Sequence, residues 1–273
     1  MQLFTLLPPC LRRAWLSAAL VRATALDLAV LAGHLLLYPS GLAPERRPAS
    51  DTAAPQLPTA GRAHPPVVLL HGFIDNRSVF VLLRRSLARH GWRHLESLNY
   101  SPLTVDVRVA AELLGRHVEE VCARTGHHEV DIVGHSLGGL IARYYVQRLG
   151  GDVRVRTLVT LATPHTGTRS ARLAHAHPIV RQMCPGSDLV EELRGPAPGV
   201  RTRFVSFWSD LDTVMIPVET ARIDHPDLVA RNVRVTGIGH LAMPVHPAVA
   251  AGVRQALTAG EAEATEQDAF SVA

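Results

Sequence analysis

EVDIVGHSLGG, residues 129–139, is the stretch around which the rest of the chain is organised. Its first half is rich in β-branched residues, which favour a buried strand, and residues 140–149 have helical spacing. The turn between them fits G-x-S-x-G, a pattern that places a serine on a sharp bend between a strand and a helix. Such a bend needs small residues two positions before and after Ser136, and Gly134 and Gly138 supply them. The stretch therefore predicts a nucleophilic serine with a helix N-terminus behind it.

Three further segments, together with the G-x-S-x-G turn, give the chain a resemblance to a known family. The chain resembles the α/β-hydrolase superfamily, and within it the bacterial serine lipases and esterases of the triacylglycerol lipase type. Besides GHSLGG, the segments that carry the resemblance are VVLLHGF (67–73), NYSP (99–102) and LATPHTG (161–167). The resemblance covers about residues 67 to 257 and implies an α/β-hydrolase fold. That fold has a mostly parallel, doubly wound sheet with helices on both faces and a lid-like insertion.

Alternating strand and helix patterns point to the same architecture, because a parallel sheet needs a crossover between successive strands. Besides the strand before Ser136, we expect strands at residues 67–73, 93–100, 153–162, 202–208 and 232–237. We expect helices at residues 77–90, 105–124, 140–149 and 247–257.

Composition divides the chain into four parts. Residues 1–43 form a leader, a signal peptide or membrane-associated helix, and residues 44–66 form a linker rich in proline and alanine. Residues 67–260 are the expected catalytic domain, in which residues 168–200 form the lid-like insertion. Residues 261–273 form an acidic tail that we expect to be a frayed, solvated end.

The leader leaves three interpretations open. Arg12-Arg13 precedes an apolar stretch, residues 14–38, which suits an export signal and is long enough to span a bilayer. Arg22 and Asp27 interrupt it, and a charge at the centre of a membrane helix costs roughly 2.5–3.5 kcal/mol. Export is therefore favoured over an uncleaved anchor, and an N-terminal helix packed against the domain is the third interpretation.

Composition also limits the function classes. The 273 residues contain 47% hydrophobic residues and carry a net charge of +4 that is spread along the chain. Without a basic run interleaved with aromatic residues, nucleic-acid binding is not expected. The three cysteines form no C-x-x-C pair, so zinc or redox chemistry is not indicated. Cys122 and Cys184 are the one pair that an oxidising compartment could join.

A serine nucleophile needs a base and an acid residue that orients the base. In this family the order along the chain is serine, acid, histidine. His240 follows an expected strand on a glycine-flanked loop, and His246 is the rival base at the start of the last helix. Asp212 is the expected acid, because residues 212–217 are similar to the D-x-V-V-x-P pattern of these lipases. Asp210 is the rival acid.

Two backbone N–H groups are expected to bind the oxyanion. One is that of Leu137, which follows the serine, and the other is that of Phe73, which follows His71-Gly72. By the resemblance, His71 shapes this loop. His135 is expected to pack beside the turn without acting as a base.

The lid-like insertion is expected to face an acyl chain. Its candidate substrate-contacting side chains are Leu173, Ile179, Val180, Met183 and Leu189. Neither crowded pair of histidines, His127-His128 or His175 with His177, has a convincing set of carboxylates nearby. We expect no metal and no cofactor.

The leading hypothesis is a serine hydrolase that cleaves carboxylic esters of lipids through an acyl-enzyme. Acyl transfer and phospholipid deacylation on the same triad are alternatives, and a non-catalytic α/β-hydrolase binding scaffold is an alternative of another class. The expected partner is a lipid or ester substrate, with possible contact to a lipid interface and none to nucleic acid. The sequence leaves the oligomeric state open. We expect a location outside the cell, either secreted or associated with the extracellular side of a membrane.

Overall fold

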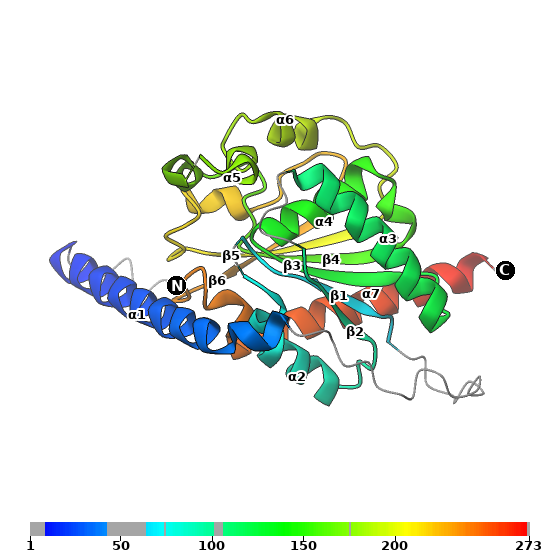
Figure 1. The fold of residues 1–273 in the computed structure, drawn as a ribbon, viewed down its shortest axis with the longest axis horizontal. Coiled ribbons are helices and arrows are strands. Elements are labelled where there is room, and N and C mark those ends of the chain that lie inside the picture. The colour runs from blue at the N-terminus through cyan, green and yellow to red at the C-terminus, as the bar shows by residue number, and fades with distance from the viewer. Residues whose placement is uncertain (1–8, 43–63, 74, 101–105, 175, 272–273) are drawn as a thin grey trace.

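The protein is built on one sheet of six parallel strands in the order β2-β1-β3-β4-β5-β6 (Figure 1). The computed structural model describes residues 9–42, 64–73, 75–100, 106–174 and 176–271. The strands are β1 (Val67–Leu70), β2 (Leu95–Leu98), β3 (Val130–His135), β4 (Val155–Leu161), β5 (Arg203–Ser209) and β6 (Val229–Val235). Each lies within two or three residues of its expected position. The expected parallel α/β sheet is therefore confirmed.

Helices cover both faces of this sheet. The α-helices are α1 (Pro9–Leu42), α2 (Val81–Arg89), α3 (Val107–Thr125), α4 (Leu137–Arg148), α5 (Pro178–Gln182), α6 (Asp188–Arg194) and α7 (Pro247–Ser271). Short 3-10 helices are η3 (Arg77–Phe80), η4 (Gly151–Val153), η5 (Arg169–Ala174), η6 (Val218–Ala221) and η7 (Met243–Val245). The helices α3 and α4 lie on one face, and α2 and α7 lie on the other (Figure 1).

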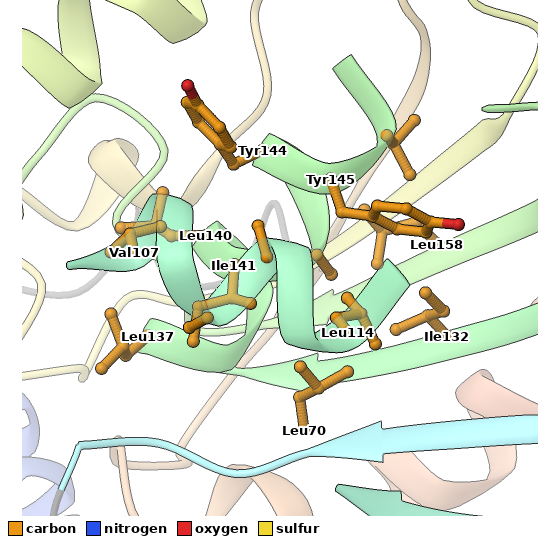
Figure 2. Packing of buried hydrophobic residues seen from close by; sticks show 14 of the residues in the cluster. Leu70, Val107, Leu114, Ile132, Leu137, Leu140, Ile141, Tyr144, Tyr145 and Leu158 are labelled. Carbon is orange, nitrogen blue, oxygen red and sulfur yellow. The ribbon is translucent and has the colours of Figure 1, made fainter. Parts of the chain in front are cut away.

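Alternating side chains of the strands build two separate hydrophobic cores. On β1, Val68 and Leu70 pack with α3 and α4, whereas Val67 and Leu69 pack with α2 and α7. This alternation follows from the two-residue period of a strand. Figure 2 shows the first core, in which Leu114 of α3 and Ile141 of α4 pack above the sheet near Leu70.

The order of the strands fixes where a ligand can bind. The chain passes from β1 outward to β2 and then returns to the other side of β1 with β3. Ligands of open α/β sheets bind beyond the carboxyl ends of the strands at such a reversal. The segment after β1 and Ser136 after β3 both lie at this point.

One expectation, that for the tail, needs correction, and most of the expected linker lies outside the described residues. The tail does not fray after Leu257, because α7 continues through residue 261 to Ser271. Alanine and glutamate dominate this segment, and both favour helix. Residues 44–63 of the expected linker lie outside the described residues. Cys122 and Cys184 are both free thiols.

The described part of the leader, residues 9–42, is one continuous helix, α1. Within it, Ala18–Gly41 has a mean hydropathy of 1.7, so this stretch is long and apolar enough to cross a membrane. A signal sequence meets the same criterion. In Figure 1, α1 runs along the outside of the domain near η3 and α2.

A buried ion pair ties the central strands to α7. The Asp131 carboxylate on β3 is fully buried and accepts hydrogen bonds from Nε and Nη2 of Arg156 on β4. The same guanidinium donates to the carbonyl of Leu257 at 3.2 Å. Removing one partner of such a pair leaves the other charge buried without compensation.

We therefore predict that Asp131→Asn lowers the free energy of unfolding by about 3–5 kcal/mol. Urea denaturation followed by circular dichroism measures it. The control is Glu119→Gln, which removes a carboxylate whose ion pair with Arg154 is largely exposed and is expected to leave the midpoint unchanged. Equal midpoints for both variants would contradict the prediction.

Candidate active site

Ser136 sits in a strained backbone conformation between β3 and α4. Its φ of 51° and ψ of −117° lie outside the regions that residues with a side chain prefer. Two hydrogen bonds hold the turn: Ser136 N–H donates to the Leu161 carbonyl, and Gly139 N–H donates to the Ser136 carbonyl. The Ser136 side chain does not cap α4. Its hydroxyl is therefore not used in capping the helix that it precedes.

The glycines around Ser136 allow very close packing. A Cβ atom on Gly134 would lie 2.6 Å from the backbone nitrogen of Gly139, and one on Gly138 would lie 2.4 Å from the Leu70 carbonyl oxygen. Both distances are below van der Waals contact. The small residues that the G-x-S-x-G pattern predicts are required here because α4 packs directly against β1 and β3.

Asp212 and His240 form a buried pair at the same edge of the sheet. His240 Nδ1 lies 2.9 Å from Asp212 Oδ2, and both residues are less than 5% exposed. Asp212 follows β5 and His240 follows β6. The other carboxylate oxygen of Asp212 accepts hydrogen bonds from the N–H groups of Val214 and Met215. These two backbone N–H groups therefore hold the Asp212 carboxylate in place beside His240.

The rival residues have other partners. Asp210 accepts a hydrogen bond from Arg234 at 2.7 Å, in a pair that is partly exposed. His246 accepts a hydrogen bond from the N–H of Ala248 at the start of α7. Among the two candidate acids and the two candidate bases, Asp212 and His240 are therefore the two side chains that contact each other.

The pair perturbs both pKa values. Burial acts to lower the pKa of His240, but the charge and hydrogen bond of Asp212, with Asp27 and Asp75, outweigh it and raise this pKa above its ordinary value. Burial acts to raise the pKa of Asp212, but protonated His240 and the backbone donors outweigh it and lower this pKa. Asp212 is therefore a carboxylate at neutral pH.

Contacts through neighbouring residues bring the serine and histidine loops together. The His135 and His240 rings have centroids 5.0 Å apart, and His135 Nε2 lies 3.3 Å from the His240 carbonyl oxygen. A Cβ atom on Gly72 would lie 3.4 Å from the Cβ of Ser136. The segments after β1, β3 and β6 therefore meet at one place.

The two expected oxyanion donors follow Ser136 and Gly72 in the chain, in two segments that approach each other. Leu137 is the first residue of α4, so its N–H has no acceptor within the helix. Phe73 follows Gly72 in the loop after β1, and its ring contacts that of His177 edge-on at a centroid distance of 5.0 Å. His71 stacks on Tyr100 at 4.3 Å, and the Tyr100 hydroxyl donates to the His71 carbonyl. These contacts fix the backbone that leads to Phe73.

Four of the five expected substrate-contacting residues are buried in the first core. Ile179, Val180, Met183 and Leu189 pack in the cluster that includes α3 and α4, whereas Leu173 is 91% exposed. These four side chains of the insertion thus pack in the same core as those of α3 and α4. That they contact an acyl chain stays a prediction.

Sequence reasoning missed a set of polar residues beside the candidate pair. Asp75 Oδ2 lies 3.6 Å from His135 Nδ1, and Asp75 Oδ1 lies 3.9 Å from His34 Nδ1. Burial acts to raise the pKa of Asp75, but the imidazoles of His135, His34 and His71 outweigh it and lower this pKa. The signal in the sequence was the regular spacing of polar residues in the leader. Among the described residues, no group of three or more histidine, cysteine or carboxylate side chains is placed to hold a metal ion.

Comparison with known proteins agrees with this fold. A family model described as palmitoyl protein thioesterase matches residues 66–196. The crystal structure of the mature form of the Bacillus licheniformis lipase BlEst2 superposes with a TM-score of 0.57 at 16% identity, covering 67% of this chain and 88% of that one. The chain has the α/β-hydrolase fold.

Two curated proteins that are similar to part of this chain are triacylglycerol lipases. The lipase of Burkholderia plantarii is 30% identical over 130 residues, which cover 45% of this chain and 36% of the lipase. That of Pseudarthrobacter phenanthrenivorans is 30% identical over 113 residues, which cover 39% of this chain and 35% of the lipase. The alignments thus span about a third of the length of these lipases. The family model ends before Asp212 and His240, so the pair rests on geometry.

We predict that Gly138→Ala prevents the normal packing of α4, because the new methyl group would overlap the carbonyls of Leu70 and His71. The variant should unfold at a lower temperature than the wild type or fail to accumulate as soluble protein. Differential scanning fluorimetry measures the first effect. Gly33→Ala is the control, since a Cβ there meets no atom within 4 Å. Wild-type stability of Gly138→Ala would contradict the close packing.

Proposed function

We propose that this α/β-hydrolase cleaves carboxylic esters of lipids with Ser136 as nucleophile, His240 as base and Asp212 as the orienting acid. The observation that carries the proposal is the buried Asp212–His240 pair, at the strand ends where the strained turn presents Ser136. A buried carboxylate on one nitrogen of an imidazole leaves the other nitrogen to take a proton. A serine hydroxyl needs such a base, because it is a weak nucleophile at neutral pH.

The reaction follows from these roles. Ser136 Oγ attacks the ester carbonyl carbon while His240 Nε2 takes the hydroxyl proton, and the charge on the carbonyl oxygen is stabilised by the N–H groups of Leu137 and Phe73. His240 then gives the proton to the leaving alcohol, and the acyl group remains on Ser136. Water attacks this acyl-enzyme with the help of the same base. The products are the acid and free Ser136.

A lipid substrate is supported by the apolar insertion and by the relatives. Ile179, Val180, Met183 and Leu189 of the insertion are apolar and buried, and an acyl chain needs an apolar wall. The matching curated proteins are triacylglycerol lipases. The palmitoyl protein thioesterase model favours a second substrate class, long-chain acyl thioesters, on the same residues.

The proposed location is the outside of the cell, secreted or bound to the extracellular side of a membrane. Support comes from the apolar stretch Ala18–Gly41. Eight large apolar side chains of this stretch are exposed: Leu20, Val21, Leu26, Leu28, Leu31, Leu35, Leu36 and Leu37. They suit contact with a lipid interface.

The function is tested with a fluorophosphonate probe and a series of esters. We expect the probe to label the wild type and not Ser136→Ala. Hydrolysis of p-nitrophenyl esters should rise from acetate to longer acyl chains, and emulsified triglyceride should be cleaved. A folded wild type that takes no label would overturn the proposal in favour of a binding scaffold. A maximum at acetate without triglyceride cleavage would overturn the lipid substrate. Faster cleavage of palmitoyl thioesters than of palmitate esters would favour the thioesterase class.

The pH profile tests the acid and the base. His240 acts as a base when neutral, and its raised pKa places the acid limb of kcat/KM above the ordinary histidine value of about 6.5. Asp212→Asn should move this limb to lower pH, since the main charge that raises the pKa is lost, and should lower kcat by about 10⁴. Asp210→Asn is the matched control and should leave both unchanged. The reverse outcome would make Asp210 the acid.

A further inference from the structure

The helix α1 contacts the domain through one regular stripe of residues. Its less exposed positions include a series spaced by three or four residues: Ala19, Ala23, Asp27, Val30, His34, Tyr38 and Gly41. Such intervals place side chains on one face of a helix. Ala23 and His34 are less than 10% exposed, and Val30 packs against the core formed by α2 and α7. Two members of the stripe, Asp27 and His34, are polar, so this face is not built for lipid.

Polar side chains of the domain cap the C-terminal end of α1. Asn76 Nδ2 donates to the Tyr38 carbonyl, Arg77 Nη2 to the Ser40 carbonyl and Asn99 Nδ2 to the Gly41 carbonyl. The last carbonyls of a helix have no acceptor role within it, so they need outside donors. Asn76 and Asn99 also accept hydrogen bonds from the N–H groups of Ser78 and Arg77. The end of α1 is thus built into the loops after β1 and β2.

Asp27 reaches the loop that carries His240. Its Oδ1 accepts a hydrogen bond from the N–H of Ala242 at 2.9 Å. Its Oδ2 fills the space beside Gly239, where a Cβ atom would lie 2.2 Å from that oxygen. The carboxylate therefore contacts the residue before His240 and the second residue after it.

Two turns of α1 further on, His34 reaches the other loop of the site. Its Nδ1 lies 3.9 Å from Asp75, and the Asp75 carboxylate in turn lies close to Gly72 and His135. A single helix thus touches the loop of the proposed base and the loop of the proposed oxyanion donor Phe73. A leader that is removed after export would take both contacts away.

We propose that α1 is retained in the working enzyme as part of its active site, where Asp27 is a positioning residue for His240. The inference rests on the proposed function. Asp27 acts by holding the 239–242 backbone, so that the imidazole keeps one orientation between Asp212 and Ser136. The apolar side of α1 faces away from the domain and stays available for a lipid interface.

The test uses the full chain and three variants, Asp27→Ala, Asp27→Asn and Arg22→Ala. Asp27→Ala should slow fluorophosphonate labelling and kcat by about tenfold to a hundredfold with little change in KM, because a misplaced base weakens only the transition state. Asp27→Asn keeps an acceptor for the Ala242 N–H and should recover most of the rate. Arg22 is exposed on the same helix, and Arg22→Ala should behave as the wild type.

The pH profile separates positioning from general loss of structure. The charged and titratable groups facing His240 are Asp212, Asp27, Asp75 and His135. Because Asp27 helps to raise the pKa of His240, Asp27→Asn should move the acid limb of kcat/KM to lower pH. If Asp27→Ala does not fold, the pH profile of Asp27→Asn decides the test. An acid limb of kcat/KM at the wild-type pH would overturn the inference.

Two further outcomes would overturn the inference that α1 is retained and that Asp27 positions His240. One is wild-type labelling and pH profile in a folded Asp27→Ala. The other is an active protein, isolated from its natural location, whose N-terminal sequence begins after residue 43. Either result leaves the proposed function intact, since the wild type would still be labelled at Ser136. Failure of the wild type to react with the probe would instead reject the proposed function itself.

Discussion

The close contact of α4 with β1 and β3 is the constraint on which the site depends. The helix can begin directly after the strand only because Gly134 and Gly138 have no side chains to meet the backbone of Gly139 and Leu70. The turn then forces Ser136 to a positive φ and frees its hydroxyl from capping the helix. Strain of this kind persists only where surrounding packing determines it. The two cores on either side of the sheet supply that packing.

The sheet brings the remaining groups to the serine because all six strands run in one direction. Segments that follow β1, β3, β5 and β6 emerge at the same edge, although they are far apart in the sequence. Burial of a carboxylate at this edge costs free energy unless donors surround it. Asp212 meets this requirement with two backbone N–H groups and His240. The pair is therefore stable as an ionised carboxylate against an imidazole.

Local patterns predicted most of the fold and the candidate site, since hydrophobic runs, glycine stops and the G-x-S-x-G turn act over a few residues. A resemblance favours Asp212 over Asp210, and the position after an expected strand favours His240 over His246; the geometry separates their partners. A helix packed against the domain is one of the three interpretations of the leader, but its contacts could not be predicted, because Asp27 and Ala242 are 215 residues apart. Charges in the leader indicate a poor membrane span, but not what they contact. The last helix extends beyond its expected end at residue 257, because the lack of apolar periodicity in the tail hides its helix propensity.

The order of the strands has a consequence for the growing chain during translation. β4 is made before β5 and β6, which add to the sheet in sequence at its far edge. A nascent polypeptide folded only through β4 carries Ser136 but neither Asp212 nor His240. On the proposed mechanism such an intermediate is inert, because nothing takes the proton from the hydroxyl. On this mechanism, competence for ester cleavage arrives only once β6 and the His240 loop that follows it have been made.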